Sequence, residues 1–146
     1  MTTPDEIVTY ARTWIGTRWR HQGRTERGID CVGLLVRTMQ NFHIPHEDVT
    51  GYRRDPSPEF IKHLHACTTH GSDPVHGAVG VFNDSIMPCH TGIFAVENGI
   101  VTVIHSEAFP SGICHEEFFE GPGSCLARNL VSVRLIKEVD YVLVPR

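Results

Sequence analysis

The stretch that decides the fold runs from residue 28 to residue 35 and reads Gly-Ile-Asp-Cys-Val-Gly-Leu-Leu. An acidic residue, Asp30, stands directly before Cys31, where an apolar pattern at helical spacing begins. Asp is a favoured helix N-cap, and helix N-termini carry partial positive charge and unpaired N–H groups. A cysteine at such a position is biased toward the thiolate, the form that attacks carbonyl carbon. We therefore predict a helix from Cys31 to about Phe42 with a nucleophilic thiol at its start.

The other elements are predicted from periodicity, caps and turn residues. Further helices are expected at Thr3–Ile15 and from Ser57 to about Cys67. Strands are expected at Ala78–Phe82, Thr91–Glu97, Ile100–His105, Val131–Ile136 and Tyr141–Val144. Loops are expected at Thr17–Ile29 and Pro110–Arg128. Helices followed by strands indicate an α+β fold, with N-terminal helices packed on a small antiparallel sheet.

Length and composition narrow the classes of function. The 146 residues, 40% of them hydrophobic, predict a single domain spanning residues 1–146. The net charge of -4, with both signs mixed along the chain, argues against binding to nucleic acid. The sequence has no run of about 18 uncharged apolar residues, so it does not predict insertion into a membrane. The first residues lack the basic and apolar regions of a signal peptide, so synthesis in the cytoplasm without an export signal is expected.

A hairpin supplies candidate partners for the thiol. Asn98-Gly99 is the strongest two-residue signal for a β-hairpin, and direct pairing from this turn sets His90 opposite Glu107 and diagonal to His105. Diagonal residues lie roughly 7 to 8 Å apart between backbones, so the two imidazole rings can meet. We expect this face of the hairpin to pack on the helix that begins at Cys31. The thiol would then meet an imidazole base, His90, oriented by His105 or by its rival Glu107.

These residues resemble the NlpC-type papain-like cysteine peptidases, which cut peptidoglycan stem peptides, and in particular the members carried by phage tails. The matching stretches are Gly16–Leu35, Cys89–Val96 and the strand that ends at His105. The helix-borne Asp-Cys-x-Gly-Leu is the specific part of the match. The resemblance implies a papain-like NlpC-type fold with Cys31 as nucleophile, His90 as base and His105 as the third polar residue.

The resemblance also implies residues that contact the substrate. Asp30 would hold the free amine of the stem peptide, and Trp19 would line the oxyanion side, where the Gln22 amide and the Cys31 backbone N–H are further candidate donors. The chain departs from the family pattern in having Val32 where Ser is frequent, Trp19 in place of tyrosine, and Gln22 within the usual Trp-Gly-Gly. The expected reaction is acyl transfer, with no cofactor and no metal at the site.

Two other functions stay open. The chain could bind a metal through residues drawn from Cys89, His90, His105, Cys114, His115 and Cys125. It could also be a catalytically silent structural subunit of a tail assembly. Since the implied substrate lies outside the inner membrane, delivery in the tail of a phage, a prophage or a phage-like gene transfer particle is expected. The chain would dock on tail-tip or baseplate proteins and act in the periplasm or cell wall. The stem-peptide bond that is cut stays open.

Overall fold

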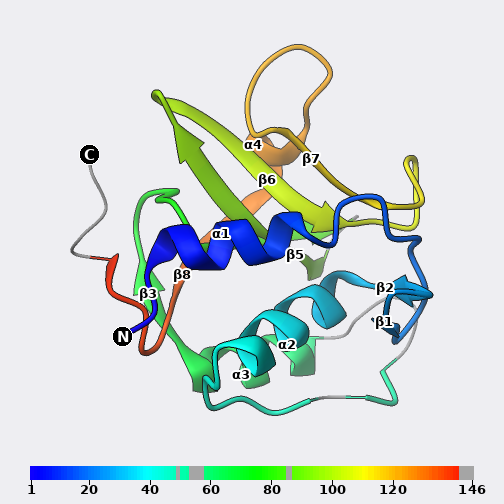
Figure 1. Cartoon of the computed structure of the whole chain (residues 1–146). Coiled ribbons are helices and arrows are strands. Elements are labelled where there is room, and N and C mark those ends of the chain that lie inside the picture. Colours follow the sequence, from blue (N-terminus) through cyan, green and yellow to red (C-terminus); the bar gives the residue numbers. More distant parts are fainter. Residues whose placement is uncertain (49, 53–57, 85–86, 142–146) are drawn as a thin grey trace.

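The computed structural model describes residues 1–48, 50–52, 58–84 and 87–141, arranged as Figure 1 shows. The helices are α1 (Pro4–Arg12), α2 (Cys31–Asn41), α3 (Pro58–Cys67) and α4 (Leu126–Asn129). The strands are β1 (Arg24–Thr25), β2 (Gly28–Ile29), β3 (Thr68–Gly71), β4 (Val79–Asp84), β5 (Met87–Glu97), β6 (Ile100–Ser106), β7 (Cys114–Phe118) and β8 (Leu130–Ile136). The predicted α+β architecture is confirmed, with N-terminal helices and a following antiparallel sheet.

The main sheet has six strands in the order β3-β8-β4-β5-β6-β7, and every neighbouring pair is antiparallel. The Asn98-Gly99 hairpin is confirmed with the predicted register, since Glu97 pairs with Ile100 and both turn residues have positive φ angles of 52° and 76°. The strands β1 and β2 form a separate small sheet within the segment predicted as a loop.

The prediction of a loop at Pro110–Arg128 is wrong. This segment contains β7, which pairs along β6, and α4. The strand Cys-His-Glu-Glu-Phe has weak β propensity of its own, and its pairing with β6 supplies the stability that composition does not. The strand β3 was also not predicted, and it pairs with β8. The strand predicted at Tyr141–Val144 lies, from residue 142 onward, outside the described residues.

Local signals set the starts of the first two helices. Thr3 caps α1 and forms a capping box with Glu6. Asp30 caps α2, and its side chain accepts a hydrogen bond from the Gly33 N–H at 2.8 Å. The helix α1 ends at Arg12, earlier than predicted, because the chain turns before Gly16, whose φ angle is 95°. The helix that starts at Cys31 is confirmed almost to the residue.

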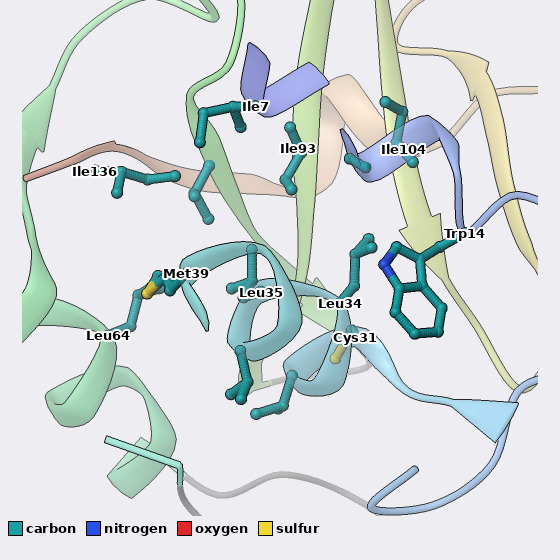
Figure 2. Close-up of a cluster of buried hydrophobic side chains, with 14 of the residues drawn as sticks. Ile7, Trp14, Cys31, Leu34, Leu35, Met39, Leu64, Ile93, Ile104 and Ile136 are labelled. Carbon is teal, nitrogen blue, oxygen red and sulfur yellow. The ribbon is translucent and has the colours of Figure 1, made fainter. Parts of the chain in front are cut away.

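The core has one layer on each face of the sheet. On one face, α1, α2 and α3 pack against the sheet in a cluster of apolar side chains (Figure 2), whose labelled members are Ile7, Trp14, Cys31, Leu34, Leu35, Met39, Leu64, Ile93, Ile104 and Ile136. On the other face, a smaller cluster contains Ala78, Phe82, Phe94, Val103, Phe119, Leu126 and Val133. Figure 1 shows α1 crossing in front of the strands, with α2 below it. The sheet is therefore apolar on both faces.

The loop before α2 is packed tightly against the start of the helix. A side-chain carbon added to Gly33 would stand 2.2 Å from the backbone oxygen of Gly23. Gly28 is similarly close to the Arg20 side chain, at 2.4 Å for an added carbon. Only glycine at position 33 lets the loop backbone approach this closely, so the glycine of the Asp-Cys-x-Gly stretch positions the loop over the first turn of α2.

Candidate active site

Cys31 is the first residue of α2 and is 6% exposed. Its place at the helix N-terminus follows from the Asp30 cap, and it puts the sulfur near the partial positive charge of the helix. Figure 2 shows Cys31 at the N-terminal end of α2. Among the described side chains, Cys31, Cys67, Cys114 and Cys125 are thiols and not half-cystines.

The carboxylate of Asp30 holds several segments together. Besides the Gly33 N–H, it accepts hydrogen bonds from the Gln22 backbone N–H at 2.8 Å, from Arg24 Nη1 at 3.0 Å and from the Tyr52 hydroxyl. Burial and this bond to Asp30 raise the pKa of Tyr52, so its hydroxyl stays protonated and donates. The network fixes the loop before α2 to the helix start. The binding of a substrate amine by Asp30 stays a prediction.

Two side chains tie the start of α2 to the sheet. Thr91 Oγ1 of β5 donates to the backbone oxygen of Cys31 at 3.4 Å, and Ser106 Oγ of β6 donates to the backbone oxygen of Ile29 at 2.6 Å. Both residues stand just past the end of the β5–β6 ladder, whose last pair is Ile93–Ile104. The helix start is therefore fixed at the end of the sheet where these two strands carry their histidines.

His90 and His105 are in direct contact. His90 Nε2 lies 2.7 Å from His105 Nδ1, and the ring centroids are 5.0 Å apart. Burial, followed by the nearby His90 and His115 rings, lowers the pKa of His105 to about 2. His105 is therefore neutral at physiological pH, with one ring nitrogen that donates and one that accepts. The predicted meeting of these two histidines is confirmed.

The expectation that the histidine face packs on the Cys31 helix is wrong. Thr91 faces Cys31, and Ile93 shares the cluster of α2, whereas Phe94 packs with the smaller cluster on the other face. His90 alternates with Thr91, and its ring lies past the end of the β5–β6 ladder beside Phe82 of the smaller cluster, with 6.2 Å between the ring centroids. The sequence did not reveal this because residues 93–96 are apolar on both faces of the strand.

A pocket of about 310 Å³ lies beside the two histidines. Its lining includes His90, His105, Glu107, Phe109, Glu117 and Cys125. The pocket combines imidazoles, carboxylates and an aromatic side chain, so it can take a polar ligand next to His90. Phe109, which is highly exposed, and Pro110 stand at this pocket on the chain between β6 and β7.

The Nε2 atom of His105, on the side of the ring away from His90, faces acidic residues. His105 Nε2 lies 3.4 Å from Glu117 Oε1, and His115 Nε2 lies 2.9 Å from Glu107 Oε1. Burial raises the pKa of Glu117. Of the two residues considered as orienting groups for His90, His105 makes the contact to its ring, while Glu107 pairs with His115.

The structure places Trp19 and Gln22 in the loop before α2. The backbone N–H of Trp19 donates to the Gly112 oxygen at 2.8 Å, and its ring centroid is 6.4 Å from that of His21. Gln22 has a φ angle of 60°, and its side-chain nitrogen donates to the Tyr52 backbone oxygen at 2.9 Å. Their predicted part in substrate binding stays a prediction.

The metal-ligand set considered from the sequence is brought together only in part. His105 and His115 pair across β6 and β7, with ring centroids 4.7 Å apart. Cys114 points to the opposite face, into the cluster of α1 and α2. Glu107 and Glu117 were not in that set. The His-x-Glu pattern, which occurs at residues 105–107 and again at 115–117, could have indicated these two glutamates, because residues two apart share one face of a strand.

Comparison with known proteins bears on the fold. No protein-family model matches the sequence, and no curated protein matches it. The solved structures that match include two that cover most of the chain. The first, described as similar to a lipoprotein of the NLP/P60 family from Staphylococcus aureus subsp. aureus Mu50, has 14% sequence identity and a TM-score of 0.65 and is matched over 91% of this chain. The chain has the NlpC/P60 fold.

The second structure is the NlpC/p60 domain of the peptidoglycan hydrolase SagA, with 18% identity and a TM-score of 0.59. The match covers 92% of this chain and 98% of the SagA domain. This chain spans only 41% of the length of the Staphylococcus aureus protein. The predicted NlpC-type papain-like fold is thus confirmed. No helix in the described residues is both long and apolar enough to cross a lipid bilayer.

Proposed function

We propose that this chain is a cysteine peptidase that hydrolyses amide bonds in peptidoglycan stem peptides. Cys31 is the nucleophile, His90 the general base and acid, and His105 the residue that orients His90. The observation that carries the proposal is the 2.7 Å contact between His90 and His105, at the end of the sheet where Thr91 bonds to the Cys31 backbone. The NlpC/P60 fold, which the peptidoglycan hydrolase SagA shares, supports the choice of substrate.

The two ring nitrogens of His90 have different roles in the proposed mechanism. Because Nε2 faces His105 Nδ1, the proton exchanged with Cys31 is carried by Nδ1 of His90. Neutral His105 accepts the Nε2–H of His90 and so favours the imidazolium form beside a Cys31 thiolate. The orienting group thereby stabilises the reactive ion pair without itself taking a charge.

The reaction proceeds by acyl transfer. The Cys31 thiolate attacks the carbonyl carbon of the amide, and His90 gives its Nδ1 proton to the nitrogen of the departing amine. The C–N bond breaks and a thioester to Cys31 remains. Water then attacks the thioester with His90 as base, which releases the carboxylate product and restores the thiol.

In the same proposal, the loop before α2 contacts the substrate. Asp30 binds the free amine of the stem peptide. Trp19 lines the oxyanion side, and the Gln22 amide and the Cys31 backbone N–H, which lies in the first turn of α2, donate to the oxyanion. The proposal is supported by the packing of this loop over the α2 N-terminus through Gly33 and the Asp30 carboxylate.

We also propose that the peptidase is carried in the tail of a phage-like particle, where it docks on tail-tip or baseplate proteins and opens the cell wall locally, acting in the periplasm or cell wall. The sequence resemblance to phage-tail members supports this. The test is mass spectrometry of purified particles. The chain should co-purify with tail proteins, and its presence in the cytoplasm but not in particles would contradict this role.

The enzymatic proposal is tested by incubating the protein with purified muropeptides of known stem sequence and identifying products by mass spectrometry. The wild type should release fragments that differ by one hydrolysed amide bond, and Cys31→Ala should release none. Cys67→Ala is the matched control, because Cys67 is a thiol at the end of α3 that does not line the histidine pocket, and it should retain activity. A wild type that cleaves none of the muropeptides would favour the silent structural subunit.

A further inference from the structure

Four side chains converge on one patch of the β6–β7 pair. His105 of β6 pairs directly with His115 of β7. Glu107 and Glu117 each follow two residues after one of these histidines, so all four side chains share a face. One ligand atom from each of His105, Glu107, His115 and Glu117 lies within 4.8 Å of all the others.

The Nε2 atoms of the two histidines in this patch have no hydrogen-bond partner among the described residues. His105 is 2% exposed, and its Nε2 atom is buried with no hydrogen bond from the described residues. The nearest acidic atom is Glu117 Oε1, at 3.4 Å. His115 Nε2 is likewise buried with no hydrogen bond within that part of the chain, although Glu107 Oε1 lies 2.9 Å away and Glu117 Oε2 lies 3.7 Å away. A buried polar atom without a partner is costly, so these two nitrogens point to a ligand between them.

We propose that His105, Glu107, His115 and Glu117 bind a divalent transition metal ion, for which Zn²⁺ fits best. Zn²⁺ takes imidazole and carboxylate ligands in tetrahedral sites at about 2.0 to 2.2 Å, which sets neighbouring ligand atoms about 3.3 to 3.6 Å apart. The separations of 3.4 Å, 2.9 Å and 3.7 Å lie around that value. Two neutral imidazoles and two carboxylates carry two negative charges, which a dication balances.

The site shares His105 with the proposed peptidase, and its effect on catalysis rests on that proposed function. A metal bound to Nε2 of neutral His105 leaves the ring proton on Nδ1, the atom that faces His90 Nε2. His105 then donates to His90 and no longer accepts from it. The imidazolium form of His90, which also carries a proton on Nε2, is disfavoured. Bound metal therefore lowers peptidase activity, and its removal restores it.

The metal site is tested first without any need for activity. Zn²⁺ binding is measured by calorimetry on the Cys31→Ala protein, so that the helix-start thiol cannot contribute. One equivalent should bind, and His115→Asn and Glu117→Gln should each weaken binding about tenfold or more. His70→Asn is the matched control, because His70 is exposed on β3, at the other edge of the sheet, and should not change binding.

Replacement by Co²⁺ separates the proposed ligands from the remaining cysteines. The Cys31→Ala protein with one equivalent of Co²⁺ should show the visible absorption of a four-coordinate nitrogen and oxygen site, without the ultraviolet bands of cobalt–thiolate bonds. Far-ultraviolet circular dichroism verifies that each variant is folded. Three results would each overturn the metal site. They are a failure to bind Zn²⁺, the appearance of cobalt–thiolate bands, and binding by His115→Asn and Glu117→Gln as tight as that of the Cys31→Ala protein.

The coupling to catalysis is tested separately, on the wild type with muropeptide substrate. Zn²⁺ at a concentration that saturates the site should reduce hydrolysis, and a chelator should restore it. Hydrolysis by the wild type that is unaffected at full Zn²⁺ occupancy would overturn the coupling. If the metal-free wild type cleaves no muropeptide, the proposed peptidase function fails, whereas the binding measurements on Cys31→Ala still decide the metal site.

Discussion

His90 and His105 are joined by a 2.7 Å contact between Nε2 of the first ring and Nδ1 of the second. The hydrogen-bonded ladder of their strands ends before them, at Ile93–Ile104. The contact is therefore made by the side chains beyond the ladder. Gly92 makes room for it, because a side-chain carbon at this position would stand 2.5 Å from Val103 and 3.1 Å from the His105 side chain.

Replacing His105 removes the ring nitrogen that accepts the hydrogen bond from His90, and this should slow catalysis more than it weakens substrate binding. We expect His105→Ala to lower kcat about 100-fold, because His90 loses the group that favours its charged form, with a smaller change in KM. His105→Gln keeps an acceptor and should recover part of the loss. Steady-state kinetics on a muropeptide measure both. Equal kcat for His105→Ala and the wild type would show that His105 does not orient the base.

The thiols should differ in their reaction with iodoacetamide at neutral pH. Burial raises the pKa of Cys114 to about 12 and also raises the pKa of Cys67, so both stay protonated and unreactive. Cys31, the nucleophile of the proposed mechanism with His90 as its base, should be alkylated first, and His90→Ala should slow it. Peptide mapping by mass spectrometry after timed quenching gives the rates. Faster labelling of Cys114 than of Cys31 would contradict this assignment.

Gly33→Ala should destabilise the fold. The added carbon would stand 2.2 Å from the Gly23 backbone oxygen, so the loop before α2 must move. Overpacking of this kind costs about 1 to 3 kcal/mol of unfolding free energy. Denaturant unfolding measures it, with Gln40→Ala on the exposed side of the same helix as control. If the two variants are equally stable, the loop does not rest on the helix start as described.

The link between α1 and β7 predicts how stability changes with pH. Glu116 accepts two hydrogen bonds from Arg12, both at 2.9 Å, and these lower its pKa in the folded state. A carboxyl group with a lowered folded pKa stabilises the protein above its unfolded pKa of about 4.3, and this stabilisation is lost as pH falls through the folded pKa. Glu116→Gln should therefore be less stable than the wild type at pH 7 by about 1 kcal/mol.

The same difference should shrink in acid. Thermal unfolding at pH 7 and at pH 3 should show the wild type and Glu116→Gln closer together at the lower pH, because the wild-type carboxyl is then partly protonated. Glu138→Gln, at an exposed position after β8, serves as control. A constant gap between the wild type and Glu116→Gln at both pH values would exclude an ionic contribution from Arg12.

The start of α2 and the hairpin could be predicted because their signals are local. Asp30 before an apolar helical pattern marks the cap, and Asn98-Gly99 sets the turn and thereby the meeting of His90 with His105. The network around the Asp30 carboxylate could not be predicted in full, since Tyr52 comes from a separate loop and only the folded chain brings it there.

The orientation of the hairpin and the acidic patch depend on tertiary pairing. Ile93 and Phe94 are both apolar, so neither face of β5 is marked as the one that meets α2. The strand β7 was not recognised because its residues have weak β propensity. Without β7, His115 and Glu117 have no place next to His105, and the patch that we propose as a metal site does not emerge from the sequence.

The most direct test of the central claim is covalent trapping of the intermediate. A muropeptide is mixed with the wild-type protein, the reaction is quenched in acid within its first turnovers, and the Cys31 peptide is analysed by mass spectrometry. We expect a mass increase equal to the acyl part of the substrate on Cys31, and no such adduct with Cys31→Ala. Product formation by Cys31→Ala at the wild-type rate would contradict the account.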